Sequence, residues 1–166
     1  MGELELIRRI RERIGDPSTG TLVGLGDDAA VFESSSGLEL LTCDAFVEGV
    51  HFRRDFASLS EIGAKCMVAN VSDVAAMGGF PSRAVISIAV PAGMTEADVE
   101  ELYAGMLDVA ERHGVEVVGG DVVSSTAGLF LSIALTGVVD PGRVVTRAGA
   151  VVGDAVVVTG TLGGSR

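Results

Sequence analysis

The chain has few aromatic residues and few cations. Only 4% of its 166 residues are aromatic and none is tryptophan, which argues against a surface that binds bases or sugars by stacking. Twelve lysines and arginines stand against 23 aspartates and glutamates, giving a formal net charge of -11. Because proteins bind the nucleic-acid backbone mainly through lysine and arginine, we expect no nucleic-acid partner. Phosphate groups would have to be bound with the help of metal ions.

Long apolar runs and paired cysteines are also missing. No run approaches the ~18 residues of a membrane span, and the alternation of apolar and charged residues at the N-terminus is not typical of a signal peptide. The two cysteines, Cys43 and Cys66, form neither a CxxC motif nor a dense framework. We therefore interpret both as core residues of a protein from a reducing compartment, and we expect a cytoplasmic protein without a membrane partner.

Apolar residues and glycine, by contrast, are abundant. Apolar residues make up 48% of the chain, enough to bury a core of mainly aliphatic side chains. Glycine occupies 23 of the 166 positions, about twice its ordinary share of ~7%. This excess predicts many tight turns, or backbone packed closely against a ligand.

Three helices are predicted. An apolar stripe from Leu4 to Ile14 indicates an amphipathic helix that should pack on another part of the protein. Capping boxes open the other two, one at Ser58 and one at Thr95. A glycine follows each helix, as is common at helix C-termini.

Six strands are predicted from apolar segments bounded by turn residues, at 29–33, 38–44, 83–91, 115–118, 129–139 and 155–158. The fourth is expected to stop at the 119–121 Gly-Gly-Asp turn. The stretch from 83 to 118 is long enough for a crossover between parallel strands, and hairpins flank it on both sides. We therefore expect an α+β fold with a mixed sheet that is covered by helices on one face.

Aspartates recur at the ends of apolar segments and in small-residue turns. They are Asp27, Asp28, Asp44, Asp73 and Asp121. An isolated carboxylate in such surroundings is costly unless it is paired or metal-bound, and cations are few. Carboxylate oxygens suit Mg2+, which commonly uses one or two of them together with substrate phosphates. We therefore expect these acids to gather in one pocket around divalent cations.

Taken singly, most of these residues have an ordinary interpretation. An aspartate beside a glycine is more often a turn residue than a ligand, His51 is typical of a half-buried structural histidine, and Lys65 of a solvated helix lysine. Asp73 differs, because it falls in the middle of a predicted helix, where aspartate is unfavourable. Asn70 lies one turn earlier on the same side of that helix.

Together, the segments resemble the thiamine-monophosphate kinases, a family of the superfamily that also contains aminoimidazole ribonucleotide synthetase, selenophosphate synthetase and a hydrogenase maturation factor. The matching segments are GDDAAV (26–31), TCDAFVEGVHF (42–52), KCMVANVSDVAAMGGFP (65–81), VVGGD (117–121), VTRAGA (145–150) and GDAVVVTGTLGGS (153–165). The VSDVAAMGG helix alone indicates only the superfamily. VEGVHF together with GDDAAV favours the kinases.

The resemblance implies a two-domain homodimer that transfers the γ-phosphoryl group of ATP to thiamine monophosphate, giving thiamine diphosphate. Residues 1–148 would form the N-terminal ATP- and Mg2+-binding and dimerisation domain of the aminoimidazole ribonucleotide synthetase-like fold, with sheet edges pairing in the dimer. Residues 149–166 would begin a truncated C-terminal domain.

The resemblance also implies roles for individual residues. Several Mg2+ ions would be held by Asp28, Thr42, Cys43, Asp44, Asp73 and Asp121, with the backbone oxygen near Cys43 as its contribution. The nucleotide would contact Gly120, Asp121, Arg147 and Tyr103, and thiamine monophosphate would contact His51. Two features depart from the family pattern: Cys43 stands where threonine is common, and GGDVV replaces the more usual GGDTT.

The proposed chemistry suits an acidic protein. Phosphoryl transfer needs mainly positioning and charge neutralisation, and metal ions can screen two polyanionic substrates from each other. The P-loop pattern does not occur. Because the acceptor phosphate oxygen is already ionised, we expect no catalytic base, and Arg147 is the one side chain expected to stabilise the transferred charge.

Two alternatives stay open. The chain could belong to another ATP-dependent member of the superfamily, of the purine-pathway, selenophosphate or hydrogenase-maturation type. It could also be an inactive dimerising fragment whose exposed sheet edges pair across a two-fold axis.

Overall fold

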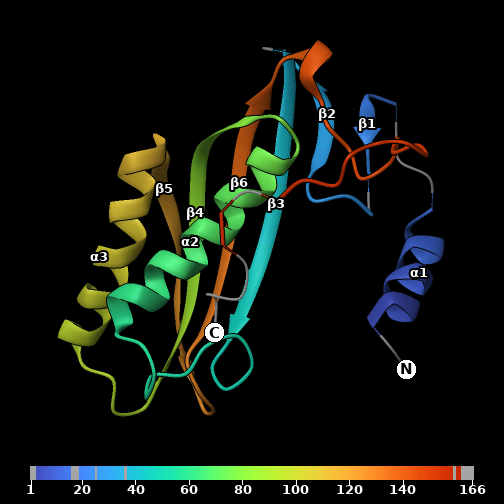
Figure 1. Cartoon of the computed structure of the whole chain (residues 1–166). Helices are drawn as coiled ribbons and strands as arrows, with labels where there is room; N and C mark the ends of the chain where they lie inside the picture. The colour runs from blue at the N-terminus through green and yellow to red at the C-terminus, as the bar shows by residue number, and fades with distance from the viewer. Residues whose placement is uncertain (1–2, 16–18, 25, 36, 159, 162–166) are drawn as a thin grey trace.

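A single six-stranded sheet forms the centre of the protein (Figure 1). The structure is a computed structural model and describes residues 3–15, 19–24, 26–35, 37–158 and 160–161. Its strands are β1 (Thr21–Val23), β2 (Ala30–Ser34), β3 (Gly37–Val47), β4 (Phe80–Pro91), β5 (Glu116–Ser125) and β6 (Phe130–Val139). Its helices are α1 (Glu3–Ile14), α2 (Leu59–Ala76) and α3 (Glu96–His113), with a short 3-10 helix at Pro141–Arg143.

The sheet is mixed, as predicted. Its strand order is β1-β2-β3-β6-β4-β5. The pair β4–β5 is parallel, and the other neighbouring strands run antiparallel. The crossover through α3 explains the parallel pair, because a connection of this length can return the chain to the same end of the sheet.

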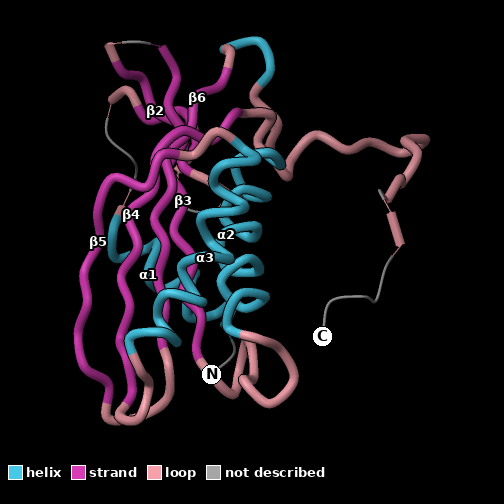
Figure 2. Tube along the Cα trace, turned by 90° about the vertical axis from the view of Figure 1, so that its left-hand side faces the viewer, coloured by secondary structure: helices cyan, strands magenta, loops and turns pink. Residues whose placement is uncertain are grey.

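The two long helices begin and end as the sequence predicts. Ser58 and Thr95 each accept a hydrogen bond from the backbone of the third helical residue, and both capping boxes are complete. Gly114 ends α3 in the left-handed conformation, with φ of 68°, which glycine adopts without a steric penalty. Figure 2 shows α2 and α3 on the same side of the strands.

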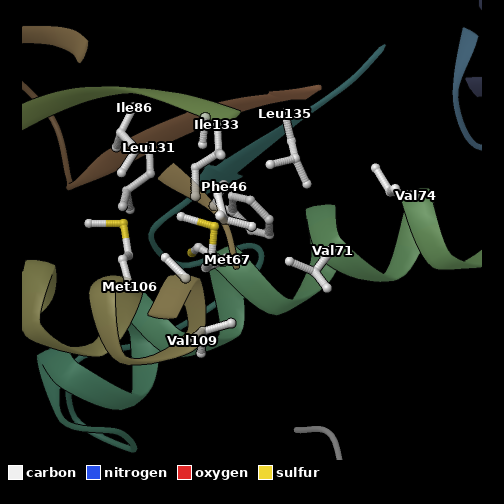
Figure 3. Close-up of a cluster of buried hydrophobic side chains, with 14 of the residues drawn as sticks. Phe46, Met67, Val71, Val74, Ile86, Met106, Val109, Leu131, Ile133 and Leu135 are labelled. Atoms are coloured by element: carbon white, nitrogen blue, oxygen red, sulfur yellow. The ribbon is translucent and has the colours of Figure 1, made fainter. Parts of the chain in front are cut away.

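The core lies between these two helices and the sheet. Figure 3 shows Met67 of α2 and Met106 of α3 close to Leu131 and Ile133 of β6, and all four side chains are fully buried. Side chains alternate along β6, so that one face of the sheet is covered and the other is open. This alternation decides which of the predicted site residues can meet.

Four expectations from the sequence are wrong. Strand β5 does not stop at residues 119–121 but continues to Ser125, because β4 supplies partners along its whole length. Residues 155–158 form no strand and are exposed, since no described strand lies beside them to share hydrogen bonds. Within this chain, Leu6, Ile7, Ile10 and Ile14 of α1 remain exposed, with Ile14 at 66%. Helix α1 lies beyond the β1 edge of the sheet, far from α3 (Figure 1).

The fourth concerns Cys43, which is exposed rather than part of the core, whereas Cys66 is fully buried. β3 is covered on one face only, so its neighbours Thr42 and Asp44 point toward the helices and Cys43 points to the open face. The short strand β1 was not predicted. No helix among the described residues is long and apolar enough to cross a membrane.

Candidate functional site

Thr42 joins two of the predicted acidic segments. Its side chain is buried on the helix-facing side of β3, where α2 packs against the strand. The hydroxyl oxygen lies 2.8 Å from Oδ2 of Asp73 in α2 and 3.2 Å from the carbonyl oxygen of Asp28. Residues from three separate parts of the chain therefore meet at Thr42.

Asn70 fixes the position of Asp44 against α2. Its side chain is fully buried. Its Oδ1 accepts a hydrogen bond from the backbone N–H of Asp44 at 3.2 Å, and its Nδ2 donates to the carbonyl oxygen of Cys66 at 3.0 Å. A buried amide with both ends bonded holds strand and helix in one register.

Negative charge accumulates around Asp73. Burial raises the pKa of its carboxyl group; the hydrogen bond from Thr42 lowers it, while the nearby charges of Asp44 and Asp28 raise it further. Asp28 and Asp44 thus both lie close enough to Asp73 to act on its carboxylate, and we call these three residues the Asp28–Asp44–Asp73 cluster. Such a cluster favours the approach of a cation.

Arg147 supplies positive charge at the edge of this cluster. Its guanidinium group donates hydrogen bonds to Oδ1 of Asp28, from Nη2 and, at 3.2 Å, from Nε. Its backbone N–H donates to the carboxylate of Asp27 at 3.2 Å. The segment that follows β6 is thereby tied to the 26–28 turn.

The atoms that could bind a metal ion in this cluster match the ligand preference of Mg2+. All the candidate ligand atoms are oxygens, as Mg2+ requires. No group of three or more His, Cys, Asp or Glu side chains in the described part of the chain is already arranged around a metal position. Mg2+ commonly uses one or two protein carboxylates together with phosphate oxygens and seldom an all-protein cage, and the carboxylates of the cluster are ligands of that kind.

Asp121 and Gly120 lie elsewhere. Asp121 pairs in register with Ser87 of β4, whose neighbour Ile86 is buried beneath the helices, so Asp121 is on the open face. Thr42 and Asp44 face the helices, and three strand-to-strand steps separate β3 from β5. Within this chain the structure does not bring Asp121 into the cluster, and its part in binding metal or nucleotide stays a prediction.

Gly120 and Tyr103 also lie apart from the cluster. A Cβ atom at Gly120 would come 1.8 Å from the carbonyl oxygen of Ile86, so only glycine fits this close approach of β5 to β4. Tyr103 is half-buried in α3, where burial raises the pKa of its hydroxyl group. No hydrogen bond connects either residue with the cluster among the described positions, and their nucleotide contacts stay predictions.

His51 lies beside a small pocket of about 250 Å³ at the end of β3. Its Nδ1 atom accepts a hydrogen bond from the backbone N–H of Val47 at 3.0 Å, and its ring packs edge-on to Phe46. The ammonium group of Lys65 donates to the carbonyl oxygen of His51 at 2.7 Å. Lys65 is thus bonded to the His51 turn, a role that no pattern in the sequence indicated.

Comparisons with known proteins show which family the chain belongs to. Residues 26–139 match the family model of AIR synthase related protein, N-terminal domain. The chain is 37% identical to thiamine-monophosphate kinase of Bacillus subtilis (strain 168), covering 99% of this chain and 51% of that protein. It is 39% identical to the enzyme of the same name from Aquifex aeolicus (strain VF5), covering 100% of this chain and 51% of that protein.

A solved structure described as AaThiL complexed with AMPPCP and TMP aligns with a TM-score of 0.73 and 37% identity, covering 82% of this chain and 41% of that one. The chain thus spans about half the length of the curated relatives it matches. The family model covers β2 through β6, including every residue of the Asp28–Asp44–Asp73 cluster. The chain therefore belongs to the AIR synthase related proteins, of which it contains the N-terminal domain.

Proposed function

We propose that this chain is the N-terminal half of a thiamine-monophosphate kinase, which transfers the γ-phosphoryl group of ATP to thiamine monophosphate. The observation that carries the proposal is the meeting of Asp28, Thr42 and Asp73, three residues from distant segments, beside a fixed Asp44. It is supported by relatives of that name and by a related structure that contains the ATP analogue AMPPCP together with TMP.

In this mechanism the chain mainly positions charge. Asp28, Asp44 and Asp73 would hold Mg2+, and Thr42 orients the carboxylate of Asp73. The ion would supply positive charge that neutralises the phosphate oxygens, so that donor and acceptor can approach. Arg147 is exposed and bonded to Asp28, so its guanidinium group lies at the edge of the cluster, where a bound phosphate would contact it.

The proposed reaction needs no catalytic base. The acceptor is a phosphate oxygen that is ionised at neutral pH, so no proton has to be removed before attack. Asp73 is engaged with Thr42, and Asp28 with Arg147. We assign these carboxylates to metal binding and not to proton transfer.

We propose further that the kinase is a cytoplasmic homodimer. The open face of the sheet exposes apolar side chains at Leu41, Val47, Val85, Val123 and Val138. An exposed apolar face of this kind is typical of an interface, and a second copy could cover it, in addition to the predicted pairing of sheet edges. The first domain would extend over residues 1–148, and residues 149–166 would begin the second.

Cys43 can report this dimer, because it lies on the open face. In the dimer we expect its alkylation to slow as protein concentration rises, in parallel with dimer formation measured by sedimentation. A monomer at all concentrations would contradict the dimer. A dimer in which Cys43 reacts at the monomer rate would place the interface elsewhere.

The activity itself is tested on the complete gene product with Mg2+, ATP and thiamine monophosphate. We expect ADP release that depends on both substrates, formation of thiamine diphosphate, and loss of turnover on chelation of Mg2+ or in Asp73→Asn. Asp108→Asn, at an exposed position of α3, is the matched control and should keep full activity. No turnover with thiamine monophosphate, but turnover with another superfamily substrate, would favour the alternative enzymes.

A further inference from the structure

The turn that contains His51 is held by bonds at both of its ends. The backbone N–H groups of Val50 and His51 donate to the carbonyl oxygen of Val47, at 3.1 and 2.9 Å. The N–H of Gly49 donates to the carbonyl oxygen of Phe52 at 2.8 Å. The turn is therefore closed on itself before any ligand binds.

Glu48 attaches this turn to the sheet. Its Oε2 accepts from the backbone N–H of Leu129 at 2.8 Å, and its Oε1 accepts from Nε of Arg54 at 2.6 Å. Gly128 permits this contact, because a Cβ atom there would lie 2.9 Å from Oε2 of Glu48. The start of the turn is thus fixed to Leu129, the residue that precedes β6.

Lys65 attaches the turn to α2. It is the only lysine in the 166 residues, and its ammonium group donates to the carbonyl oxygen of His51 at 2.7 Å. A hydrogen bond from a charged donor is stronger than one between neutral groups. The side chain is exposed at the rim of the pocket, so it contributes little to the core.

The bond between Val47 and His51 determines which ring nitrogen carries the proton. A backbone N–H can only donate, so Nδ1 of His51, 3.0 Å away, has to be unprotonated. The neutral ring then carries its proton on Nε2. No described residue forms a hydrogen bond with Nε2, which leaves it available to a ligand in the pocket that His51 lines.

The remaining cation near the pocket is already engaged. The guanidinium group of Arg53 bonds to Asp55, with Nε 2.9 Å from Oδ1, and its central carbon lies 4.2 Å from the centre of the Phe56 ring. Because Arg53 is engaged, the Nε2–H group of His51 is left as a donor at this pocket. It belongs to a neutral ring and suits an oxygen or nitrogen acceptor on a small substrate.

We propose that Lys65 is a positioning residue for substrate recognition. By holding the carbonyl group of His51, Lys65 keeps the imidazole protonated on Nε2. The Nε2–H group is then directed toward an acceptor atom of the substrate that receives the phosphoryl group. This inference rests on the proposed kinase function. Lys65 acts through His51 and does not itself touch the reacting phosphates.

The test compares Lys65→Met, which keeps the apolar stem, with Lys65→Arg, which restores a charged donor. In the complete gene product, we expect Lys65→Met to raise KM for thiamine monophosphate about tenfold, the loss typical of a charge-assisted hydrogen bond. KM for ATP and kcat should change little, and Lys65→Arg should restore most of the affinity. Arg112→Met, which removes an exposed cation from α3, is the control and should match the wild type.

A second measurement is independent of turnover. In protein with 15N-labelled histidine, the long-range 1H–15N spectrum should show wild-type His51 protonated on Nε2. The same spectrum of Lys65→Met should show a mixture of tautomers or an exchange-broadened ring. A spectrum unchanged by Lys65→Met, or a wild-type ring protonated on Nδ1, would overturn the proposal.

The kinetic and spectroscopic measurements distinguish a failure of the Lys65 proposal from a failure of the kinase proposal. If the wild type does not use thiamine monophosphate, the kinase proposal fails and the spectra alone decide the role of Lys65. If the wild type is active but Lys65→Met leaves KM unchanged, or lowers kcat with both KM values unchanged, the positioning role is wrong and the kinase proposal stands.

Discussion

The hydroxyl oxygen of Thr42 lies 2.8 Å from Oδ2 of Asp73, although 31 positions separate the two residues in the chain. Thr42 comes from a strand and Asp73 from a helix, so the contact exists only when α2 is packed on β3. The hydroxyl group is a neutral hydrogen-bond donor to a carboxylate that has two further acids near it. Folding thus brings together negative charges that would lie farther apart in the unfolded chain.

Asp73→Asn should stabilise the fold while it removes activity. Burial, together with the charges of Asp44 and Asp28, raises the pKa of Asp73. The ionised carboxylate therefore lowers the free energy of unfolding at neutral pH. Asparagine keeps an oxygen for Thr42 without the charge. We expect a higher Tm at pH 7 in thermal unfolding and a fall in kcat of at least about 100-fold.

The sign of this effect can be checked by pH. A raised pKa means that the folded state binds the proton more tightly, so the stability that Asp73 contributes is lost as pH rises through its folded pKa. The difference in Tm between Asp73→Asn and the wild type should therefore narrow as the pH is lowered. A Tm below that of the wild type at pH 7 would show that Asp73 is stabilising and that the cluster is not strained.

Glu48 should give the opposite pH dependence. The bond from Arg54 holds its pKa below the usual range, and the N–H of Leu129 adds to the effect. Its stabilisation is therefore present above the ordinary Glu value of about 4.3 and is lost as pH falls through the lower folded value. Glu48→Gln should reduce the free energy of unfolding at pH 7 by about 1 kcal/mol, measured by urea denaturation.

A matched exposed acid serves as the control for Glu48. Glu116 pairs with Arg83 at 3.4 Å, but its side chain is 70% exposed, and exposed pairs of this kind contribute little. Glu116→Gln should leave stability unchanged at pH 7. Equal effects of the two substitutions would mean that the contact with Leu129 does not matter.

Gly105→Ala should destabilise the contact between α2 and α3. A Cβ atom at Gly105 would come 1.8 Å from the carbonyl oxygen of Ser60, so the helices would have to move apart. Overpacking of this kind costs about 1–3 kcal/mol, measurable by chemical denaturation. Gly142→Ala is the control, since nothing lies within 4 Å of its Cβ position; a similar loss there would point to a general effect of replacing glycine.

The two cysteines should differ sharply in reactivity. Burial raises the pKa of the Cys66 thiol to about 12, whereas Cys43 is exposed. Because the thiolate is the reactive form, iodoacetamide at pH 8 should add one label to the native chain at low concentration and two in denaturant, counted by mass spectrometry. In Cys43→Ser we expect no label on the native protein; rapid labelling there would mean that Cys66 is accessible.

Local sequence patterns predicted most of the elements. The capping boxes at Ser58 and Thr95 specify helix starts through contacts between residues three positions apart, and alternating apolar residues specify β6. The wrong strand predictions depended on whether another strand pairs with the segment. Strand β5 continues through residues 119–121 because β4 pairs with it. Residues 155–158 stay outside the sheet because no described strand pairs with them.

The sequence by itself determined most of the elements, the acidic character and the side of α2 on which Asn70 and Asp73 lie, because these depend on residues a few positions apart. Only the tertiary structure decided which acids meet. The packing of α2 on β3 joins Asp73 to Thr42, while the two-residue alternation of β3 turns Cys43 away and the register of β5 places Asp121 on the open face. The contact of Lys65 with His51 likewise depends on a turn and a helix that approach each other only when the core between them is packed.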